Sequence, residues 1–392
     1  MPFYPVPSMK KSIFHEIREL KRFRRLPAAQ RRIVFYAESG NYYVSFEAMI
    51  DHLSGEAERT VAYVTSDPAD PVLSTDNPRI LPFYINKLVT LFFTSVKARV
   101  FVMTIPDLNV YHLKRSSNPV HYVYVFHSLV STHMMYRASA FDHYDSILCV
   151  GPHQVAEIRK READENLPAK TLVEGGYYRL ERVYQRYQAY CAEQESGADR
   201  PIEVLIAPSW GENHVLESCG MALVDVLLKA GYRVTVRPHP ETVKSQPELL
   251  DGYDKAYGSN ERFELERNVR SDASMLRSDL LISDLSGIVL EYALGTERPV
   301  LFVDVPHKVK NPAYESFGME PIELQLRKRL GVMLAPEDIA QAAEAVEALV
   351  QRKDAYQAEL AAIRGEVAYA FGQSGQVGAE HILSLLKNKK TA

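Results

Sequence analysis

The stretch DLLISDLSGIVLEYALGTERPVLFVD, residues 279–304, decides the fold class of this chain. It begins and ends with short apolar segments, 279–284 and 299–304, with a helix-like segment from about 287 to 294 between them. Both apolar segments lack polar alternation, as expected for strands of a parallel sheet that helices cover on both faces. The stretch therefore predicts a strand, a tight turn, a helix and a second strand of an α/β protein.

The same alternation of apolar strands and helical segments extends outward from this unit. Further strand candidates occur at 31–37, 60–65, 98–104, 121–126, 145–151, 202–208 and 232–240. A helix-like stretch that ends in a polar run before Pro201 separates two series of strands and is typical of an interdomain linker. The sequence therefore predicts two Rossmann-like domains that face each other across a cleft.

We predict domain boundaries from this pattern. The Rossmann-like domains occupy residues 31–180 and 202–350, and residues 181–201 form the linker between them. Helical segments are expected at both ends of the chain, in residues 1–30 and 351–392.

Composition and charge argue against several classes of protein. The 392 residues include 46 Lys and Arg against 50 Asp and Glu, a net charge of −4, so no global positive field favours nucleic acid. The cysteines Cys149, Cys191 and Cys219 lie far apart without the spacing of metal ligands, which predicts free thiols. We find no apolar run of the ~18–20 residues that a membrane span needs and no signal peptide, and therefore expect a cytoplasmic protein.

The segment KKSIFHEIRELKRFRRLPAAQRR, residues 10–32, differs from the rest of the chain. It carries nine Lys and Arg residues against Glu16 and Glu19, and its apolar residues recur at helical spacing. Such a basic amphipathic helix suits the anionic surface of a membrane, on which the protein would be peripheral. A terminal helix docked on its own domain would show the same pattern, and the sequence leaves both interpretations open.

The sequence RPHP, residues 237–240, follows a strand candidate. Ligands of open α/β sheets bind beyond the carboxyl ends of strands, so Arg237 and His239 are expected to point toward a ligand. Arg offers a planar fork of donors and His a single proton or hydrogen bond, which together suit a phosphate. The alternative is a strand-end turn with two solvated polar groups.

The turn after the strand at 279–284 is a second candidate site. Ser286 and Gly287 precede a helix whose free N–H groups and partial positive charge favour an anion such as a diphosphate. Glu291 lies about one turn further along the same helix, where its carboxylate could accept hydrogen bonds from ribose hydroxyls. The alternative is an ordinary Ser N-cap with an exposed glutamate.

Two further loops carry candidate residues. His127 follows the strand at 121–126, and an imidazole is suited to deprotonating a hydroxyl near neutral pH. His127, His133 and His143 match no zinc motif, and no metal ligand is predicted. Ser209, after the strand at 202–208, could line a phosphate or base pocket, although a plain loop explains it equally well. The glycine-rich dinucleotide fingerprint is absent, which disfavours an NAD-dependent dehydrogenase.

Five pieces of the chain together resemble the CDP-glycerol glycerophosphotransferase family, which primes and polymerises teichoic acids and related polymers. They are FHS at 126–128, GYYRLERV at 176–183, APSW at 207–210, RPHP at 237–240 and SDLSGIVLEYALGTERPVLFVD at 283–304. The resemblance implies a two-domain GT-B architecture, with the acceptor on the N-terminal domain and the nucleotide donor on the C-terminal domain.

The resemblance also implies a reaction and a set of roles. An alditol phosphate, such as glycerol phosphate, passes from a CDP-linked donor to a hydroxyl of a glycan or polyol-phosphate acceptor, free or lipid-linked, and CMP leaves. This reaction belongs to the synthesis of teichoic-acid-like polymers or capsular polysaccharide. His127 would be the base. Arg237, His239, Ser286 and the helix N-terminus at Gly287 would hold the diphosphate, with His239 counted as catalytic beside His127. Ser209 would belong to the nucleotide-binding pocket, and Glu291 would hold the ribose. No cofactor is required, although Asp284 and Asp304 would suit Mg²⁺.

The chain departs from the family pattern at identifiable positions. Ser128 stands where the family typically has a glycine after its histidine, and Gly287 stands where the family has the second of two serines. The identity of the transferred unit therefore stays open. A nucleotide-sugar glycosyltransferase is the first alternative. A UDP-N-acetylglucosamine 2-epimerase-like enzyme is less favoured, because Glu291 stands alone on its helix where those enzymes have consecutive glutamates.

Overall fold

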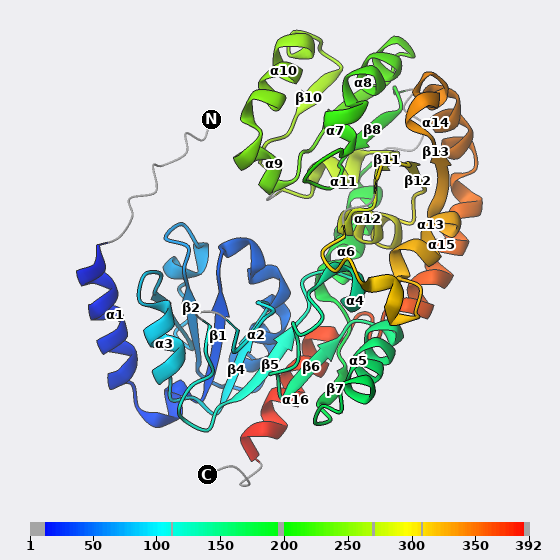
Figure 1. Cartoon of the computed structure of the whole chain (residues 1–392). Helices are drawn as coiled ribbons and strands as arrows, with labels where there is room; N and C mark the ends of the chain where they lie inside the picture. Colours follow the sequence, from blue (N-terminus) through cyan, green and yellow to red (C-terminus); the bar gives the residue numbers. More distant parts are fainter. Residues whose placement is uncertain (1–11, 111–112, 195–199, 269–270, 307–308, 388–392) are drawn as a thin grey trace. The chain divides into compact units, whose positions relative to one another are not determined.

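The computed structural model describes residues 12–110, 113–194, 200–268, 271–306 and 309–387. The chain divides into two compact units, each built on one parallel sheet (Figure 1). Unit 1 comprises residues 1–127, 136–178 and 368–392, and unit 2 comprises residues 128–135 and 179–367. The predicted α/β class with two Rossmann-like domains is confirmed.

The sheet of unit 1 has seven strands in the order β3-β2-β1-β4-β5-β6-β7, all parallel. Their bounds are β1 Ile33–Ala37, β2 Val61–Thr65, β3 Ile80–Tyr84, β4 Val100–Met103, β5 His121–Val125, β6 Ser146–Cys149 and β7 Thr171–Glu174. The central strands are apolar throughout because both of their faces are buried, as Phe35 and Tyr36 of β1 illustrate. The Phe35 ring packs against Phe46 on one face, and the Tyr36 ring packs against Phe93 on the other.

The helices of unit 1 are α1 Ile13–Arg25, α2 Glu47–Ser54, α3 Val89–Ser95, α5 Pro152–Asp164 and α16 Ser374–Lys387. Helix α16 completes the core of this unit, because Ala379 and Ile382 are fully buried beside the central strands. Two glycines allow its close approach to α2: a Cβ at Gly375 would overlap the side chain of Ala48, and a Cβ at Gly378 would overlap that of Met49. The core of unit 1 therefore includes residues from both ends of the described chain.

The sheet of unit 2 has six parallel strands in the order β10-β9-β8-β11-β12-β13. Their bounds are β8 Glu203–Ile206, β9 Arg233–Val236, β10 Phe263–Leu265, β11 Leu280–Ser283, β12 Val300–Val303 and β13 Gly331–Leu334. The helices near the ligand-binding candidates are α7 Val215–Ser218, α8 Gly220–Lys229, α9 Pro240–Ser245, α10 Pro247–Tyr257, α11 Ala273–Arg277 and α12 Gly287–Thr296. The others are α4 Thr132–Met135, α6 Tyr178–Glu193, α13 Ile322–Leu330, α14 Ala342–Gln351 and α15 Lys353–Val367.

Short 3₁₀ helices connect several of these elements. They are Ala28–Arg31, Gly40–Ser45, Pro71–Ser74, Tyr314–Phe317 and Pro336–Gln341. Among the described residues, no helix is both long and apolar enough to span a membrane.

The division of the chain differs in detail from the predicted boundaries. Most of the predicted linker, 181–201, lies in helix α6, which belongs to unit 2 from Arg179 onward, and residues 195–199 lie outside the described part. The predicted tail, 351–392, contributes α15 to unit 2 and α16 to unit 1. Residues 128–135, which follow a strand of unit 1, belong to unit 2. Residues 1–11 and 388–392 of the predicted terminal segments are outside the described range.

Helix α1 docks on unit 1 through one of its faces. The buried carboxylate of Glu16 accepts hydrogen bonds from the backbone N–H groups of Asn86 and Leu88, both at 3.0 Å. Phe23 is also buried and packs edge-to-face on Phe92, with 5.0 Å between ring centroids. Because the start of α3 would otherwise leave N–H groups without partners, Glu16 fixes the position of α1 against that helix. Docking of this helix is therefore an observed feature of unit 1.

Candidate anion site at the strand ends of unit 2

Three predicted site residues lie at one edge of the sheet of unit 2. Strands β9, β8 and β11 are neighbours and run in the same direction, so their carboxyl ends meet at that edge. His239 follows β9, Ser209 follows β8 and Ser286 follows β11. The edge is where open α/β sheets bind ligands. The structure thus brings together residues that are up to 77 positions apart in the sequence.

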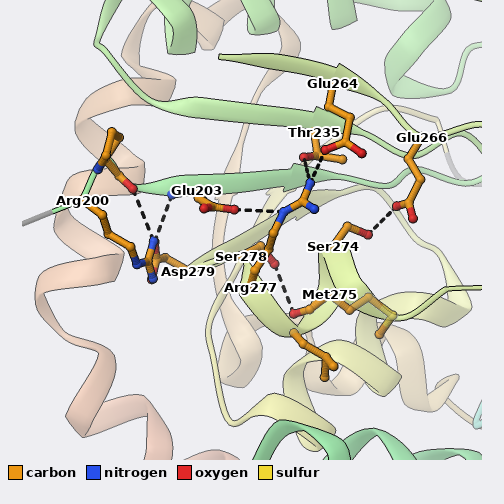
Figure 2. Close-up of polar contacts among 12 residues, drawn as sticks. Arg200, Glu203, Thr235, Glu264, Glu266, Ser274, Met275, Arg277, Ser278 and Asp279 are labelled. Atoms are coloured by element: carbon orange, nitrogen blue, oxygen red, sulfur yellow. Dashed lines mark hydrogen bonds and ion pairs between the residues drawn. The ribbon is translucent and has the colours of Figure 1, made fainter. Parts of the chain in front are cut away.

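Arg277 of α11 links three neighbouring strands of this sheet, two of which carry site residues. Figure 2 shows Arg277 extended across the sheet, where its guanidinium contacts Glu203 on β8, Thr235 on β9 and Glu264 on β10. The Nε atom lies 3.0 Å from the carboxylate of Glu203, and an Nη atom donates to Thr235 at 2.9 Å. Because one side chain contacts three adjacent strands, it resists sliding of β9 and β10 relative to β8.

Asp284 fixes the loop that carries Ser209. One carboxylate oxygen of Asp284 accepts from the backbone N–H of Ser209 at 2.7 Å, and the other accepts from the Ser209 hydroxyl at 2.9 Å. Asp284 is buried, and this burial raises the pKa of its carboxyl above the ordinary value, while the hydrogen bonds from Ser209 act in the opposite direction. Asp284 therefore holds the β8 and β11 loops together, with both oxygens committed to the protein.

The start of α12 offers donors to an anion. Ser286 takes the N-cap position with extended backbone, φ −121° and ψ 147°, yet its hydroxyl makes no capping hydrogen bond. The first N–H groups of an α-helix have no partner within the helix, and the helix dipole adds partial positive charge there. A phosphate at this point could accept hydrogen bonds from the Ser286 hydroxyl and from the backbone N–H groups that follow.

His239 is oriented by its own loop. Its Nδ1 accepts a hydrogen bond from the backbone N–H of Glu241 at 3.1 Å, at the start of α9. The neutral ring must then carry its proton on Nε2, which makes that atom a hydrogen-bond donor. Trp210, the only tryptophan of the chain, stacks on the same imidazole with 5.7 Å between ring centroids and an angle of 27°. Sequence reasoning identified His239 but not its stacking on Trp210, which joins the β8 and β9 loops.

Arg237 is buried beneath the loops. Its Nη1 donates to the carbonyl of Ser271 at 2.8 Å and to the hydroxyl of Ser274 at 3.1 Å, and lies 3.6 Å from the carboxylate of Glu266. Burial lowers the pKa of the Arg237 guanidinium below its ordinary value, and Glu266 acts against this shift. These contacts connect the end of β9 to the turn before α11. A direct contact between Arg237 and a diphosphate stays a prediction.

Glu291 is buried in an ionic network. Its Oε2 accepts from Nε of Arg179 at 2.6 Å, and Arg179 also lies 3.6 Å from Asp272. Asp272 in turn pairs with Arg186 at 2.6 Å, so the network joins α12, α11 and α6. Sequence reasoning gave no signal for Asp272, because the partners lie far apart along the chain. Contact of Glu291 with a ribose stays a prediction, and the network would set the orientation of its carboxylate.

The histidines of the 126–136 segment separate into different surroundings. His127 lies in unit 1, where its carbonyl accepts from the Tyr177 hydroxyl at 2.8 Å and its ring is flanked by Tyr42 at 5.3 Å between centroids. His133 lies in unit 2, where it stacks on Phe317 at 4.7 Å. His133 is therefore part of the packing of unit 2, whereas the role of His127 as a base stays a prediction.

In the described part of the chain, no group of three or more His, Cys, Asp and Glu side chains is arranged to hold a metal ion. Of the two carboxylates predicted to suit Mg²⁺, Asp284 is engaged by Ser209 and Asp304 pairs with Arg327 at 3.0 Å.

Comparisons with known proteins agree with this architecture. No protein-family model matches the chain. A search of curated proteins also gave no significant match. Among solved structures, the wall teichoic acid polymerase TagF, soaked with CDPG, matches with a TM-score of 0.62 and 14% identity over 100% of both chains. The chain shares its fold with TagF.

Other enzymes have the same fold. A UDP-bound structure of MnaA from S. aureus matches with a TM-score of 0.60 and 14% identity, over 92% of this chain and 98% of that one. The UDP-GlcNAc 2-epimerase of Neisseria meningitidis, bound to UDP-GlcNAc, matches with a TM-score of 0.57 and 14% identity, over 90% of this chain and 99% of that one. At these identities the comparisons establish the predicted GT-B-like fold, and the activity has to be argued from the site.

Proposed function

We propose that this protein transfers an alditol phosphate from a CDP-linked donor to a hydroxyl of a glycan or polyol-phosphate acceptor and releases CMP. One observation carries the proposal: the Nε2 donor of His239 after β9 and the uncapped hydroxyl of Ser286 after β11 lie at one edge of the sheet, and the Ser209 loop after β8, fixed by Asp284, lies between them. A nucleoside diphosphate needs such a set of donors. The five sequence pieces that resemble the CDP-glycerol glycerophosphotransferase family favour CDP-linked over other donors.

In this mechanism the donors of unit 2 bind the diphosphate. The N-terminus of α12 and the Ser286 hydroxyl would hold one phosphate, and Nε2 of His239 would donate to the non-bridging oxygens. These groups stabilise the charge that spreads over the phosphoryl oxygens during transfer. Glu291, oriented by Arg179, would accept hydrogen bonds from the ribose. The protein contributes positioning and charge stabilisation rather than a covalent intermediate.

The transfer itself is a displacement at the distal phosphorus. A bond forms between the acceptor oxygen and that phosphorus, the bond from the phosphorus to the bridging oxygen breaks, and CMP leaves with the electron pair. His127 would accept the proton of the attacking hydroxyl. We expect His127→Ala to lower turnover by about 10²–10⁴ with little change in donor affinity. His133→Ala should instead lower stability, because its ring packs on Phe317. A loss of donor affinity alone in His127→Ala would contradict this role.

The proposal assigns no required metal to the protein. Should the donor bring Mg²⁺ with its diphosphate, turnover would fall in the presence of EDTA and return when Mg²⁺ is added. Turnover that is unaffected by EDTA would agree with stabilisation of the diphosphate by hydrogen bonds from His239 and Ser286 and by the α12 dipole alone.

The decisive experiment compares nucleotide donors. A ligand at 100 times its dissociation constant stabilises the folded state by about 2.7 kcal/mol, which a thermal-shift assay detects. We expect CDP-linked donors to raise the melting temperature more than UDP- or GDP-linked donors, and the enzyme to release CMP when an acceptor is added. A preference for UDP-linked compounds would instead favour a nucleotide-sugar glycosyltransferase or an epimerase-like activity.

We further propose that the outward face of α1 binds an anionic membrane surface. Phe14 is 75% exposed, and Arg18, Lys21 and Arg25 are exposed on the same helix, which docks on unit 1 by its opposite face. An exposed aromatic ring beside basic side chains suits the interface of a bilayer that contains anionic lipid. This surface would bring a soluble active site to a lipid-linked acceptor.

Charge reversal tests the membrane proposal without removing the docked helix. Arg18→Glu, Lys21→Glu and Arg25→Glu together should weaken sedimentation with vesicles of anionic lipid roughly a hundredfold, at about 1 kcal/mol for each basic residue. The control variant reverses three exposed lysines of unit 2, Lys255, Lys328 and Lys353, and so has the same net charge. Equal losses in both variants would attribute binding to net charge and contradict a role for α1.

A further inference from the structure

A hydroxyl of the 128–135 segment lies directly beside the side-chain position that Gly287 leaves empty. A Cβ built on Gly287 would lie 2.7 Å from Oγ of Ser128 and 3.9 Å from its Cβ. The first of these distances is too short for a real contact, so any side chain at 287 would displace the Ser128 hydroxyl. Ser128 therefore stands at the first residue of α12, where the free N–H groups of that helix begin.

The position of Ser128 is held by the rest of its segment. One carboxylate oxygen of the buried Glu323 accepts from the backbone N–H of Ser131 at 2.8 Å and from the Ser131 hydroxyl at 3.2 Å. The side-chain amide of Asn311 donates to the carbonyl of His133 at 2.8 Å. These contacts tie the segment to unit 2, although the strand before it belongs to unit 1.

Two hydroxyls thus lie at the start of α12 without using their donors on the protein. Within the described ranges, neither Ser128 nor Ser286 donates a side-chain hydrogen bond to another residue, and Ser286 does not cap its helix. Ser128 is half-buried. A hydroxyl beside the free N–H groups of a helix is suited to an anion that accepts several hydrogen bonds at once.

We propose that the Ser128 hydroxyl is a phosphate-binding group of the α12 site, in the place that a side chain at position 287 would otherwise take. This inference rests on the proposed binding of a nucleoside diphosphate there. It also accounts for two departures of the chain from the family pattern. The chain has a serine at 128 where the family has glycine, and a glycine at 287 where the family has serine. Together, the two changes replace a hydroxyl on residue 287 with a hydroxyl on residue 128 at the same end of α12.

The exchange predicts a specific pattern in a double-mutant cycle. Ser128→Gly removes the hydroxyl, and should weaken CDP binding roughly tenfold to a hundredfold. Gly287→Ser should weaken binding as well, because the new side chain meets Ser128. Ser128→Gly combined with Gly287→Ser should return the affinity to within a few-fold of the original protein. Ser316→Ala, which alters an exposed hydroxyl that donates to the carbonyl of Ala313, should change nothing.

The experiment measures dissociation constants of CDP, UDP and inorganic pyrophosphate by calorimetry for all five proteins. Losses that add in the double variant, or a Ser128→Gly affinity equal to that of the original protein, would overturn the inference. If the rescue occurs but UDP binds more tightly than CDP, the inference stands and the proposed CDP-linked activity fails. If none of the three probes binds the original protein, both fail.

Discussion

His239 combines two functions in one ring, and substitutions can separate them. Its Nδ1 caps the backbone of Glu241, and its Nε2 carries the proton of the neutral ring and is a hydrogen-bond donor. The Oδ1 atom of an asparagine can replace Nδ1 as a cap but brings no donor to the position of Nε2. We therefore expect His239→Asn to keep the melting temperature of the free protein and to weaken nucleotide binding tenfold or more.

His239→Ala should lose both functions, with an additional cost of about 0.5–2 kcal/mol for the missing cap. Chemical denaturation without ligand and calorimetry with CDP measure the two effects separately. An asparagine variant that binds CDP as tightly as the original protein would show that Nε2 does not contact the ligand.

Residue-scale reasoning from the sequence succeeded where a residue's position along a strand decides its place. Ser209, His239 and Ser286 each follow a buried strand, so parallel pairing alone brings them to one edge. It failed where contacts depend on packing between distant segments. Nothing in the sequence places Ser128 against Gly287, and nothing identifies Asp284, rather than a ligand, as the partner of Ser209.

At the level of elements, the sequence predicted the central strands and missed the edge strands. The four strands without a prediction, β3, β7, β10 and β13, are the outermost strands of their sheets. Pro82 interrupts β3, which is tolerated because an edge strand need not donate every ladder hydrogen bond. All four residues of β7 are at least partly exposed, so this strand lacks the apolar run that marked the others. Edge strands are half-buried, and the pattern used to find strands requires burial on both faces.

The contact between α16 and α2 is an element-scale feature that a single methyl group should disturb. A Cβ at Gly375 would overlap Ala48 and approach its backbone, which cannot rotate away. We expect Gly375→Ala to lower the free energy of unfolding by about 1–3 kcal/mol through overpacking. Gly365→Ala is the control: this exposed glycine lies within α15 with nothing near its Cβ position.

Gly365→Ala should raise the free energy of unfolding by about 0.5–1 kcal/mol, because alanine has a higher helix propensity than glycine. Urea denaturation of both variants gives the comparison. A Gly375→Ala protein that is as stable as the Gly365→Ala protein would mean that α16 can shift away from α2 without cost.

Burial of His381 on α16 makes the packing of this helix in unit 1 sensitive to acid. Burial lowers the pKa of His381 to about 4, and nearby His121 acts in the same direction. The folded-state pKa lies below the ordinary value, so the stability contribution is complete above about pH 6.5 and is lost as the pH falls toward 4. Over this pH range the free energy of unfolding should fall by about 3 kcal/mol, because the pKa is lowered from 6.5 to about 4 and one pKa unit corresponds to about 1.4 kcal/mol.

We expect His381→Leu to flatten the decline of stability between pH 6.5 and 4, as measured by denaturation at a series of pH values. His143→Gln, a change at an exposed histidine, serves as the matched control. A decline that is as steep in His381→Leu as in the original protein would assign the acid sensitivity to other groups.

At the level of the whole molecule, the chain passes between its two units four times, near residues 127, 135, 178 and 367. Unit 1 is consequently incomplete without a segment that follows unit 2 in the sequence. We expect a fragment of residues 1–178 to lack a cooperative thermal transition, because the apolar surface that Ala379 and Ile382 cover would be exposed to water.

Joining residues 368–392 to the fragment through a flexible linker should restore the transition, and circular dichroism during heating would record it. The control carries the same linker and segment with Ile382→Asp. A fragment of residues 1–178 that melts cooperatively by itself would show that α16 is dispensable to unit 1.

Helix α16 packs in unit 1 but is synthesised after unit 2, and this affects the order in which the two units can fold during translation. A ribosome that adds about 5–20 residues per second needs roughly 10–40 s to pass from residue 178 to the end of the printed chain. Throughout that interval, the nascent first sheet has all its strands but not the helix that completes its core. Unit 2, in contrast, has all its residues before α16 emerges. The half of the protein that is made second can therefore finish folding first, and the half that is made first would need protection by chaperones in the meantime.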